Sequence, residues 1–332
     1  MKQAVGGKAL DLSGVYGYIQ PEMEEVEKRL REELSSGYAV INELVDHMSK
    51  FQGKRLRPGL VLFCAKASGE VRDLHYRLAV VAEMIHNATL VHDDVLDEAK
   101  LRRRVQSLNH RWGNEMSVLF GDYLFARAFT VCASIEDRRV TQVLAETSQE
   151  ICLGELLQTY SRYDFGIREA DYFHVIQLKT ASLFGSCCRL GALCGGSDEA
   201  TARALAEYGL NIGIAFQVMD DYLDIVGDEN EMGKSLGTDL LKGKVTLPII
   251  LMLEAMDDAK RREAIEFISS DGLPEKRKDI VAMLNDYNVL DLSVERAARY
   301  VERAKIQLRV LKDSIYKDSM EALAEFVVQR TH

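Results

Sequence analysis

The sequence predicts an all-α protein. Apolar residues recur at helical spacing (i, i+3, i+4, i+7) almost throughout the 332 residues, while the alternating pattern typical of strands is hard to find. Proline, which ends or kinks helices, occurs only 4 times. With 47% hydrophobic residues the chain can bury a large core, and no linker separates two parts of it. We therefore expect a single domain over residues 1–332, with residues 1–20 as a loose N-terminal extension.

The helices can be placed in order along the chain. The first should begin near Pro21, because proline and the acidic residues that follow it favour the first turn of a helix. A basic loop over residues 53–58 leads into the next helix, and residues 228–243 form a long loop rich in Gly and Lys. Further helices are expected over residues 74–98, 114–135, 139–160, 172–194, 199–226, 244–257, 259–268, 275–286 and 293–314.

Composition excludes several classes of partner. A net charge of −10 disfavours nucleic acid and anionic membranes. No apolar run reaches the roughly 18 residues that cross a bilayer, and the N-terminus lacks the apolar core of a signal peptide. The six cysteines lie in apolar helical stretches and are interpreted as buried thiols of a cytoplasmic protein: Cys64, Cys132, Cys152, Cys187, Cys188 and Cys194.

Two aspartate clusters of the same shape lie far apart in the chain. They read Asp93-Asp94-Val95-Leu96-Asp97 and Asp220-Asp221-Tyr222-Leu223-Asp224, and each fits the pattern D-D-x-x-D. On an α-helix residues i and i+4 share a face, so Asp93 and Asp97 should point together with Asp94 on the flank. Each cluster follows an apolar run, residues 88–91 and 212–216, which disfavours the simpler interpretation of a solvated acidic face.

Carboxylates packed this closely repel one another unless a cation joins them. Mg²⁺ is the natural cation, because it takes hard oxygen ligands and bridges protein carboxylates to substrate phosphates. Two such clusters that face each other would hold several Mg²⁺ ions around one diphosphate. The motifs therefore predict a magnesium-dependent site for a diphosphate substrate.

Basic residues flank both aspartate clusters in the sequence. They form three groups: Gly53-Lys54-Arg55-Leu56-Arg57-Pro58, Arg102-Arg103-Arg104, and Gly233-Lys234-Ser235 with Gly243-Lys244. Arginine presents a planar fork to phosphate oxygens, and glycine lets a backbone approach an anion. Any one group alone is better interpreted as solvated surface, but together they are placed to bind a diphosphate.

Three further polar residues interrupt apolar helices. Lys179 and Thr180 are adjacent, and Gln217 precedes Asp220 by one helical turn and so faces the same way. The Thr180 hydroxyl could instead bond to its own helix.

Together these residues resemble the trans-isoprenyl diphosphate synthases, also called polyprenyl synthetases. The resemblance covers nearly the whole chain. It implies the isoprenoid synthase fold, in which antiparallel helices surround a deep central cavity, and a homodimer. It rests on the motifs G-K-R-L-R-P, H-N-A-T-L-V-H-D-D-V-L-D-E-A-K-L-R-R, G-D-Y-L-F-A-R-A-F, L-K-T-A-S-L-F, F-Q-V-M-D-D-Y-L-D and G-K-S-L-G-T-D-L-L-K-G-K-V-T-L-P.

By position, the resemblance implies a role for each polar residue. Mg²⁺ on the allylic diphosphate would be bound by Asp93, Asp94, Asp97, Asp220, Asp221 and Asp224. Isopentenyl diphosphate would be held by Lys54, Arg57, His86 and Arg103. An allylic diphosphate such as farnesyl diphosphate would contact Arg102, Lys179, Thr180, Gln217, Lys234 and Lys244. The family pattern is broken where Arg104 and Gln106 replace a glycine and a proline, which leaves open which arginine binds which substrate.

These roles describe a prenyltransferase that couples two diphosphates. Mg²⁺ and the basic residues would neutralise the departing pyrophosphate, and a dry pocket would protect the allylic cation from water. The Thr180 hydroxyl and the Gln217 carbonyl would turn the negative ends of their dipoles to that cation. The proton would leave with pyrophosphate, because no side chain is an obvious general base. The residues expected to act in catalysis are Lys179, Thr180, Gln217, Asp93 and Asp220.

Product length should depend on the helix that carries Asp93. One isoprene unit is about as long as one helical turn, roughly 5 Å, and short-chain members of the family place a bulky aromatic residue one turn deeper. Ala88 and Thr89 stand at that depth here, with Met84 and Ile85 in the next layer. We expect an open tunnel and a long all-trans product, octaprenyl above all, which would become a quinone side chain.

Other functions fit fewer of these residues. A class I terpene cyclase ionises a diphosphate but usually lacks a second full D-D-x-x-D. A metal-dependent phosphohydrolase, suggested by His92-Asp93, would need further histidines at metal spacing. A short-chain farnesyl or geranylgeranyl diphosphate synthase is a further alternative. Another is a subunit of a heteromeric synthase, although partner subunits generally lose one aspartate cluster and this chain keeps both.

Overall fold

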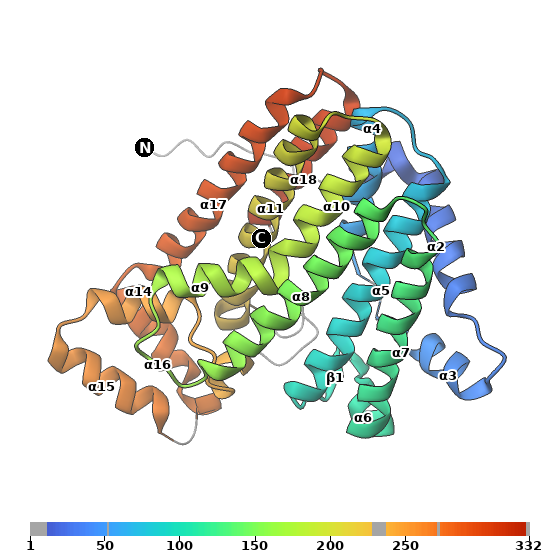
Figure 1. Ribbon diagram of the computed structural model, residues 1–332. Coiled ribbons are helices and arrows are strands. Elements are labelled where there is room, and N and C mark those ends of the chain that lie inside the picture. Colours follow the sequence, from blue (N-terminus) through green and yellow to red (C-terminus); the bar gives the residue numbers. More distant parts are fainter. Residues whose placement is uncertain (1–11, 52, 228–236, 271–272, 330–332) are drawn as a thin grey trace.

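A computed structural model describes residues 12–51, 53–227, 237–270 and 273–329, and these residues form an almost entirely helical bundle (Figure 1). The only strands among them are two residues long, β1 (Leu101–Arg102) and β2 (Val105–Gln106), and they pair as an antiparallel hairpin. The predicted all-α class is confirmed. That the chain is a single domain stays a proposal, supported by one apolar core that takes residues from Val15 to Val327.

Short connections join the helices. The first half of the described chain contains α1 (Leu12–Tyr16), η1 (Gly17–Ile19), α2 (Gln20–Leu34), α3 (Ala39–Met48), α4 (Leu56–Ser68), α5 (Asp73–Leu96), α6 (Leu108–Trp112), α7 (Asn114–Ala133) and α8 (Arg138–Tyr160). The second half contains α9 (Glu169–Ile176), η2 (Gln177–Ala181), α10 (Ser182–Gly195), α11 (Glu199–Val226), α13 (Thr238–Leu241), α14 (Leu247–Ala255), α15 (Asp258–Ser269), α16 (Leu273–Asp286), α17 (Val289–Gln307), η3 (Leu308–Val310) and α18 (Ile315–Gln329). The segments η1 and η3 are 3₁₀ turns, and η2 is a π-helix.

Side-chain caps fix where several helices begin. Asp137 accepts a hydrogen bond from the Arg139 amide at the start of α8, and Asp198 accepts one from the Thr201 amide at the start of α11. Asp257 accepts from two amides at the start of α15. Each carboxylate satisfies first-turn amides that have no partner within the helix, which stabilises a helix by about 1 kcal/mol.

The core lies where α4, α5, α10 and α11 pack together in the middle of the bundle (Figure 1). Residues 58–65 of α4 are buried on all sides, as expected of a helix with no solvated face. Glycines let α10 and α11 approach closely, because a Cβ on Gly209 would lie 2.4 Å from the Phe184 carbonyl oxygen. Both helices that carry aspartate clusters, α5 and α11, therefore pack on α10.

The described part of the predicted N-terminal extension is packed, not loose. Residues 12–19 form α1 and η1, and α1 contacts α18. Val15 and Ile19 are buried in the core, and their i, i+4 spacing is the apolar signal that the sequence interpretation overlooked. Residues 1–11, the rest of that expected extension, lie outside the described residues.

Three further expectations differ from the structure. The helix expected over residues 172–194 is divided by the π-helix η2, and α17 begins at Val289, before the expected residue 293. Cys152 is exposed, whereas the other five cysteines are buried as expected. Its apolar neighbours in the sequence, Leu153 and Leu156, are themselves exposed on α8, so an apolar stretch did not mean burial there.

By length and composition alone, one described helix, α7, could cross a membrane, although no such segment was expected. A core helix of a soluble bundle passes the same test. α7 packs against α2, α5 and α6, and it buries Phe120, Leu124 and Ala128. These contacts support its place as a helix of the bundle.

The β1–β2 hairpin turns at the point where the sequence departs from the family pattern. Arg103 and Arg104 both have positive φ angles, 50° and 68°. Two-residue hairpin turns of type I′ need this backbone at both positions and favour glycine there. Arg104 therefore takes up a left-handed conformation that costs a non-glycine residue about 1 kcal/mol. Gln106 pairs with Leu101 as a strand residue, so the turn is kept without the family's glycine and proline.

Candidate active site

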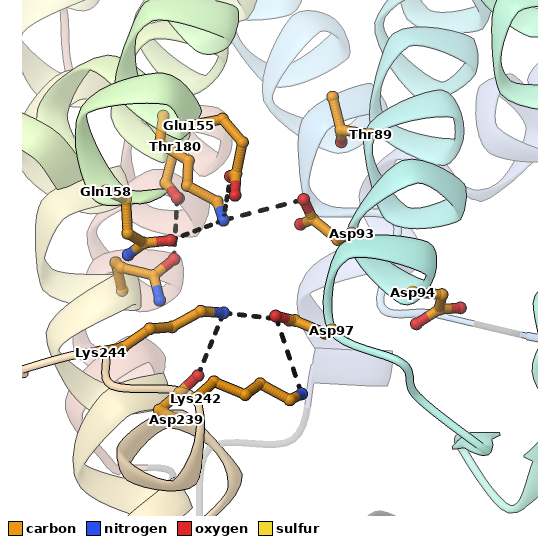
Figure 2. Close-up of polar contacts among 12 residues, drawn as sticks. Thr89, Asp93, Asp94, Asp97, Glu155, Gln158, Thr180, Asp239, Lys242 and Lys244 are labelled. Carbon is orange, nitrogen blue, oxygen red and sulfur yellow. Dashed lines mark hydrogen bonds and ion pairs between the residues drawn. The ribbon is translucent and has the colours of Figure 1, made fainter. Parts of the chain in front are cut away.

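The carboxyl end of α5 turns two of its three aspartates toward lysines from distant parts of the chain (Figure 2). Asp93 Oδ1 lies 3.8 Å from Lys179 Nζ in η2. Asp97 Oδ2 accepts a 3.0 Å hydrogen bond from Lys244 Nζ, and Asp97 Oδ1 lies 3.7 Å from Lys242 Nζ. The structure thus brings together Asp93, Asp97, Lys179 and Lys244, four of the predicted site residues.

Opposite charges stabilise one another in this partly buried cluster. Burial alone would raise the pKa of the Asp97 carboxyl, but Lys244 and Lys242 lower that pKa below its ordinary value. Burial also opposes the charge of Lys179, yet Asp93 and Glu155 raise the pKa of the Lys179 ammonium. The carboxylates and the ammonium groups are therefore both charged at neutral pH. A metal ion could replace the lysines as partner of the aspartates, and a diphosphate could replace the aspartates as partner of the lysines.

Asp94, the middle residue of the first motif, points away from the lysines and is only 2% exposed (Figure 2). Its carboxylate accepts hydrogen bonds from Arg102 Nε at 2.8 and 2.9 Å and from Arg102 Nη2 at 2.6 Å. A bidentate guanidinium–carboxylate pair of this kind is strong and directional. Burial still raises the pKa of Asp94, against the effect of Arg102. Asp94 thus fixes the position of Arg102 on the hairpin.

Lys179 and Thr180 lie in the π-helix η2, which helical periodicity did not predict. π turns inside α-helices occur frequently at functional sites. Two glycines make room for this one. A Cβ on Gly154 of α8 would lie 2.5 Å from the Lys179 amide nitrogen, and a Cβ on Gly213 of α11 would lie 2.5 Å from Ala181 Cα. Packing from both sides therefore sets the direction of Lys179 and Thr180.

The second motif lies near the carboxyl end of α11, and the hydrogen-bond donors to its middle residue are neutral. Asp221 is 6% exposed, and it accepts hydrogen bonds from the Tyr172 hydroxyl at 2.7 Å and from Gln217 Nε2 at 2.8 Å. Burial raises the pKa of Asp221 to about 7. Gln217 Oε1 in turn accepts a 2.8 Å hydrogen bond from the Thr180 hydroxyl. The predicted residues Thr180, Gln217 and Asp221 are therefore connected directly.

The outer aspartates of the second motif differ from each other. Asp224 is 1% exposed, and it accepts hydrogen bonds from the Thr238 hydroxyl at 3.3 Å and from the Asp239 amide at 3.2 Å. It thereby anchors the start of α13, which precedes Lys244. Asp220 is half-buried, and its charge acts on Arg57 and Arg103.

Arg57, His86 and Arg103 form a second basic cluster. The Arg57 guanidinium lies 4.5 Å from the centre of the Phe184 ring. Arg103 Nη1 donates a 2.7 Å hydrogen bond to the Phe51 carbonyl oxygen. Burial, followed by the charges of Arg57 and Arg103, lowers the pKa of His86 well below its ordinary value. His86 is therefore neutral at neutral pH, and the arginines carry the positive charge of the cluster.

The remaining basic residues are placed differently. The Lys54 ammonium lies 4.4 Å from the centre of the Phe326 ring. Arg55, to which no role was assigned, pairs with Glu27 and with the buried Glu83, and it therefore stabilises the junction of α2, α4 and α5. Lys234 lies outside the described residues.

Several site residues were missed by the sequence interpretation. Lys242 was available from the sequence, because it stands beside Lys244 in K-G-K. Arg162 Nη2 lies 3.7 Å from Asp97 Oδ1, but Arg162 belongs to a turn without a recognisable motif. Lys179 also pairs with Glu155 and donates a 3.0 Å hydrogen bond to Gln158, both on α8. Tyr172 gave no signal beyond that of an apolar helix.

The residues expected to set product length lie along α5. Ala88, Met84 and Ile85 are almost fully buried. Thr89 is half-buried, and its hydroxyl donates a 2.8 Å hydrogen bond to the His86 carbonyl oxygen. Thr89 stands one turn from Asp93 on the same face (Figure 2), whereas Ala88 is turned from Thr89 by about 100°.

The phosphohydrolase alternative finds no support in the geometry. His92 Nε2 lies 3.2 Å from the Val118 carbonyl oxygen and 3.5 Å from Asp122 Oδ1, so it faces α7 and not Asp93's lysine partner. Within the part of the chain that the structure describes, no three His, Cys, Asp or Glu side chains lie as close together as the ligands of one metal ion, and this includes the motif aspartates.

An all-helical bundle with two D-D-x-x-D segments and clusters of lysines and arginines defines a prenyltransferase of the isoprenoid synthase fold. Residues 38–286 match the polyprenyl synthetase family, and the chain belongs to that family. The resemblance seen in the sequence is confirmed, and membership disfavours the terpene cyclase alternative.

Similar proteins cover almost the full length of the chain. The octaprenyl diphosphate synthase of Escherichia coli (strain K12) is 34% identical over 324 residues, which are 97% of this chain and 99% of that protein. Heptaprenyl diphosphate synthase component 2 of Geobacillus stearothermophilus is 33% identical over 97% of this chain and 100% of that protein. The crystal structure of polyprenyl synthase from Caulobacter crescentus CB15, complexed with calcium and isoprenyl diphosphate, has a TM-score of 0.91 and 34% identity, covering 98% and 99% of the two chains.

Proposed function

We propose that this prenyltransferase condenses an allylic diphosphate, such as farnesyl diphosphate, with successive isopentenyl diphosphate units to make a long-chain all-trans polyprenyl diphosphate. The observation that carries the proposal is the convergence of Asp93 and Asp97 with Lys179 and Lys244. A second basic cluster, around Arg57, supplies charge for a second diphosphate. Two anion sites suit a reaction that joins two diphosphates.

The donor set fits Mg²⁺ by its chemistry. Asp93, Asp97 and Asp220 offer the hard carboxylate oxygens that this ion prefers. When bound, Mg²⁺ would supply Lewis-acid neutralisation of the leaving diphosphate. Similarity to a polyprenyl synthase complexed with calcium, another divalent cation that takes oxygen ligands, supports this assignment. The other three aspartates, Asp94, Asp221 and Asp224, are buried and accept hydrogen bonds from protein donors, so we propose supporting roles for them.

The basic residues would share the two substrates. Lys179 and Lys244, with Lys234, Gln217 and Thr180 as expected from the sequence, would hold the allylic diphosphate, and Arg102 would do so from the position that Asp94 gives it. Lys54, Arg57 and Arg103 would hold isopentenyl diphosphate, with His86 donating or accepting as a neutral imidazole. These preset charges would stabilise pyrophosphate as it departs without any reorganisation of the protein.

Carbon–oxygen cleavage would leave an allylic cation beside Thr180 and Gln217. The electron pair of the isopentenyl double bond would form the new carbon–carbon bond. The proton lost from the adjacent carbon would pass to the released pyrophosphate, because no side chain of the described site is an obvious general base. The apolar core around η2 would exclude water from the cation.

We propose that the product is long, with octaprenyl favoured, and that it serves as a quinone side chain. The composition of α5 supports this, because Ala88, Ile85 and Met84 place no aromatic side chain on the helix below the aspartates. Two similar proteins are named for long prenyl products, heptaprenyl diphosphate and octaprenyl diphosphate. Ala88→Phe should shorten the product, whereas Ala88→Ser should not. An unchanged product from Ala88→Phe would place the end of the tunnel elsewhere.

The test of the proposed function is product analysis. The purified chain is incubated with Mg²⁺, farnesyl diphosphate and labelled isopentenyl diphosphate, and the alcohols are sized after dephosphorylation. A ladder that ends at or near octaprenol supports the proposal. A farnesyl or geranylgeranyl product would support the short-chain alternative and refute the argument from Ala88.

A second candidate is the catalytic component of a two-chain synthase. It is favoured by 33% identity over the full length of a protein named component 2. The distinguishing result is a purified chain that incorporates no label alone but does so when a second protein from its own source is added.

We also propose a homodimer, supported by apolar residues that lie exposed on two neighbouring helices. They are Val118 and Leu119 on α7, and Leu153, Leu156 and Tyr160 on α8. A monomeric mass in solution would refute this. A cytoplasmic location without nucleic-acid or membrane partners is proposed from the net charge of −10.

A further inference from the structure

A chain of three hydrogen bonds connects α9, α11 and η2. The Tyr172 hydroxyl donates to Asp221 Oδ2 at 2.7 Å, and Gln217 Nε2 donates to Asp221 Oδ1 at 2.8 Å. The Thr180 hydroxyl donates to Gln217 Oε1 at 2.8 Å. Tyr172 stands seven residues before Lys179 in the sequence and has no part in the proposed function.

The two residues at the Tyr172 end of this series of hydrogen bonds are deeply buried. Tyr172 is 4% exposed and Asp221 is 6% exposed. A buried hydroxyl or carboxylate without a partner costs about 1–3 kcal/mol, so each of the two requires the other. The Tyr172 ring is fixed as well, because it packs edge-on against Phe173 with ring centres 5.4 Å apart. Asp221 is therefore held in place by a rigid donor.

This arrangement decides which end of the Gln217 amide faces Thr180. In the structure the amide turns its NH₂ group to Asp221 and its carbonyl oxygen to Thr180, which is the orientation that an ionised, acceptor-only Asp221 favours. The opposite orientation would place two oxygens against each other in a buried setting. Thr180 then has a single acceptor for its single hydrogen, and its lone pairs are left to face outward.

We infer that Tyr172 and Asp221 are positioning residues, which orient the Gln217 amide and the Thr180 hydroxyl so that oxygen lone pairs, not hydrogens, meet the allylic cation. The inference rests on the proposed function of Thr180 and Gln217. It gives Asp221 a role other than the metal binding expected from the motif. A reversed amide would present positive hydrogens to a cation and would repel it.

Charge preference in binding tests this inference without turnover. The ligands are a prenyl-like tertiary ammonium and its neutral carbon isostere, each titrated calorimetrically into the full-length protein with Mg²⁺ and pyrophosphate. We expect the native protein to bind the ammonium about tenfold more tightly than the isostere, which corresponds to roughly 1.4 kcal/mol. Tyr172→Phe should bring that ratio close to one while the isostere binds as before. A native ratio near one, or an unchanged ratio in Tyr172→Phe, would overturn the inference.

Kinetics separate positioning from general damage. Tyr172→Phe should lower kcat by about tenfold or more and leave KM for both diphosphates within about twofold, because none of their basic partners is touched. The matched control is Tyr300→Phe, which removes a hydroxyl from a ring packed on the same Phe173 and should leave kcat unchanged. A rise in KM with kcat retained would contradict a positioning role.

A second variant covers the case in which Tyr172→Phe is unstable. Asp221→Asn removes the acceptor-only group and lets the amide reverse, so it should lose both charge preference and kcat while retaining Mg²⁺-dependent binding of the allylic diphosphate. If Asp221→Asn instead loses that binding, Asp221 is a metal ligand and the inference is wrong. A native protein that shows charge preference but transfers no prenyl group would refute the proposed function and leave the orientation argument standing.

Discussion

The two D-D-x-x-D motifs share one sequence pattern and have nearly opposite surroundings. On α5 the partners of the carboxylates are cations, such as Lys244 at Asp97 and Arg102 at Asp94. On α11 the buried Asp221 accepts its hydrogen bonds from a phenol and an amide, which are neutral donors. The difference lies in the helices that pack around each motif, not in the motif itself.

This difference indicates two different tasks. Ion pairs in a partly open cluster can be exchanged for other ions when a charged ligand arrives. Hydrogen bonds between buried neutral groups and a carboxylate hold one geometry, because any other leaves a polar atom unsatisfied. Asp93 and Asp97 of the α5 motif are therefore suited to binding, and Asp221 of the α11 motif is suited to positioning. Each prediction below would sharpen this contrast or break it.

The largest effect is expected at the centre of the α5 cluster. Asp97→Asn removes the carboxylate that meets both Lys242 and Lys244, and we expect kcat/KM to fall on the order of 10²–10³-fold. Steady-state kinetics with varied Mg²⁺ would measure it. Asp122→Asn, an exposed carboxylate on α7, is the control and should behave as the native protein. Near-native activity of Asp97→Asn would remove the basis for a binding role.

The next largest effect is expected at Gly213 of α11, which packs against the π-helix η2. A Cβ in Gly213→Ala would meet the backbone at Ala181 and displace Lys179 and Thr180. Overpacking of this kind costs about 1–3 kcal/mol, and a shift of about 1 Å at a reacting group can cost about 10²-fold in rate. Gly37→Ala, which meets nothing within 4 Å, is the matched control for thermal unfolding and kcat. Native kcat in Gly213→Ala would mean that the π turn does not fix the site.

A smaller effect is expected in the hairpin that carries Arg102. Arg104→Gly relieves a positive φ of 68° and should raise the free energy of unfolding by about 1 kcal/mol. Urea unfolding measures the gain, and Arg111→Gly, at a helical position, should show a loss instead. The KM for isopentenyl diphosphate should stay the same. An increase in that KM would show that Arg104 binds phosphate and belongs with the basic residues around the α5 motif.

The smallest effect lies at the other end of α5, where His75 is fully buried and accepts a 2.9 Å hydrogen bond from the Arg72 amide. Burial lowers the pKa of His75 below its ordinary value of 6.5. The unfolded chain therefore takes up a proton first as pH falls, so this contribution to stability is complete above about pH 6.5 and declines below it. His86 shifts in the same direction.

Unfolding in urea between pH 7.5 and pH 5.5, about one unit either side of the ordinary histidine value, checks this. His75→Asn should lose less stability across that interval than the native protein does, and the exposed His110→Asn should follow the native curve. Identical slopes for all three proteins would show that titration of His75 plays no part in acid sensitivity.

Sequence reasoning reached the parts of the molecule that depend on local pattern. Helical periodicity located α5, α7, α8 and α11, and charge pattern located Asp93, Asp97, Lys179 and Lys244. It could not predict the π-helix, because the cause lies in Gly154 and Gly213 on other helices. It could not predict that Asp93 and Asp94 have different roles, since the partner of Asp93 comes from η2 and the partner of Asp94 comes from the β1–β2 hairpin.

Partners of this kind are set by tertiary packing. Tyr172 and Arg162 stand in segments with no motif, and only the fold brings them to Asp221 and Asp97. Exposure of Cys152 follows from the outer face of α8, which the apolar sequence around it does not reveal. In each case the sequence predicted the helix or turn that holds the residue, but not which parts of the fold lie next to it.

The most direct test of the contrast is Mg²⁺-dependent binding of farnesyl diphosphate, measured by calorimetry without isopentenyl diphosphate. The native protein, Asp97→Asn and Asp221→Asn are compared under identical conditions. We predict that Asp97→Asn loses the Mg²⁺-dependent part of binding, whereas Asp221→Asn retains it. Equal loss in both variants would show that the two motifs bind metal alike, and it would contradict the division into a binding motif and a positioning motif.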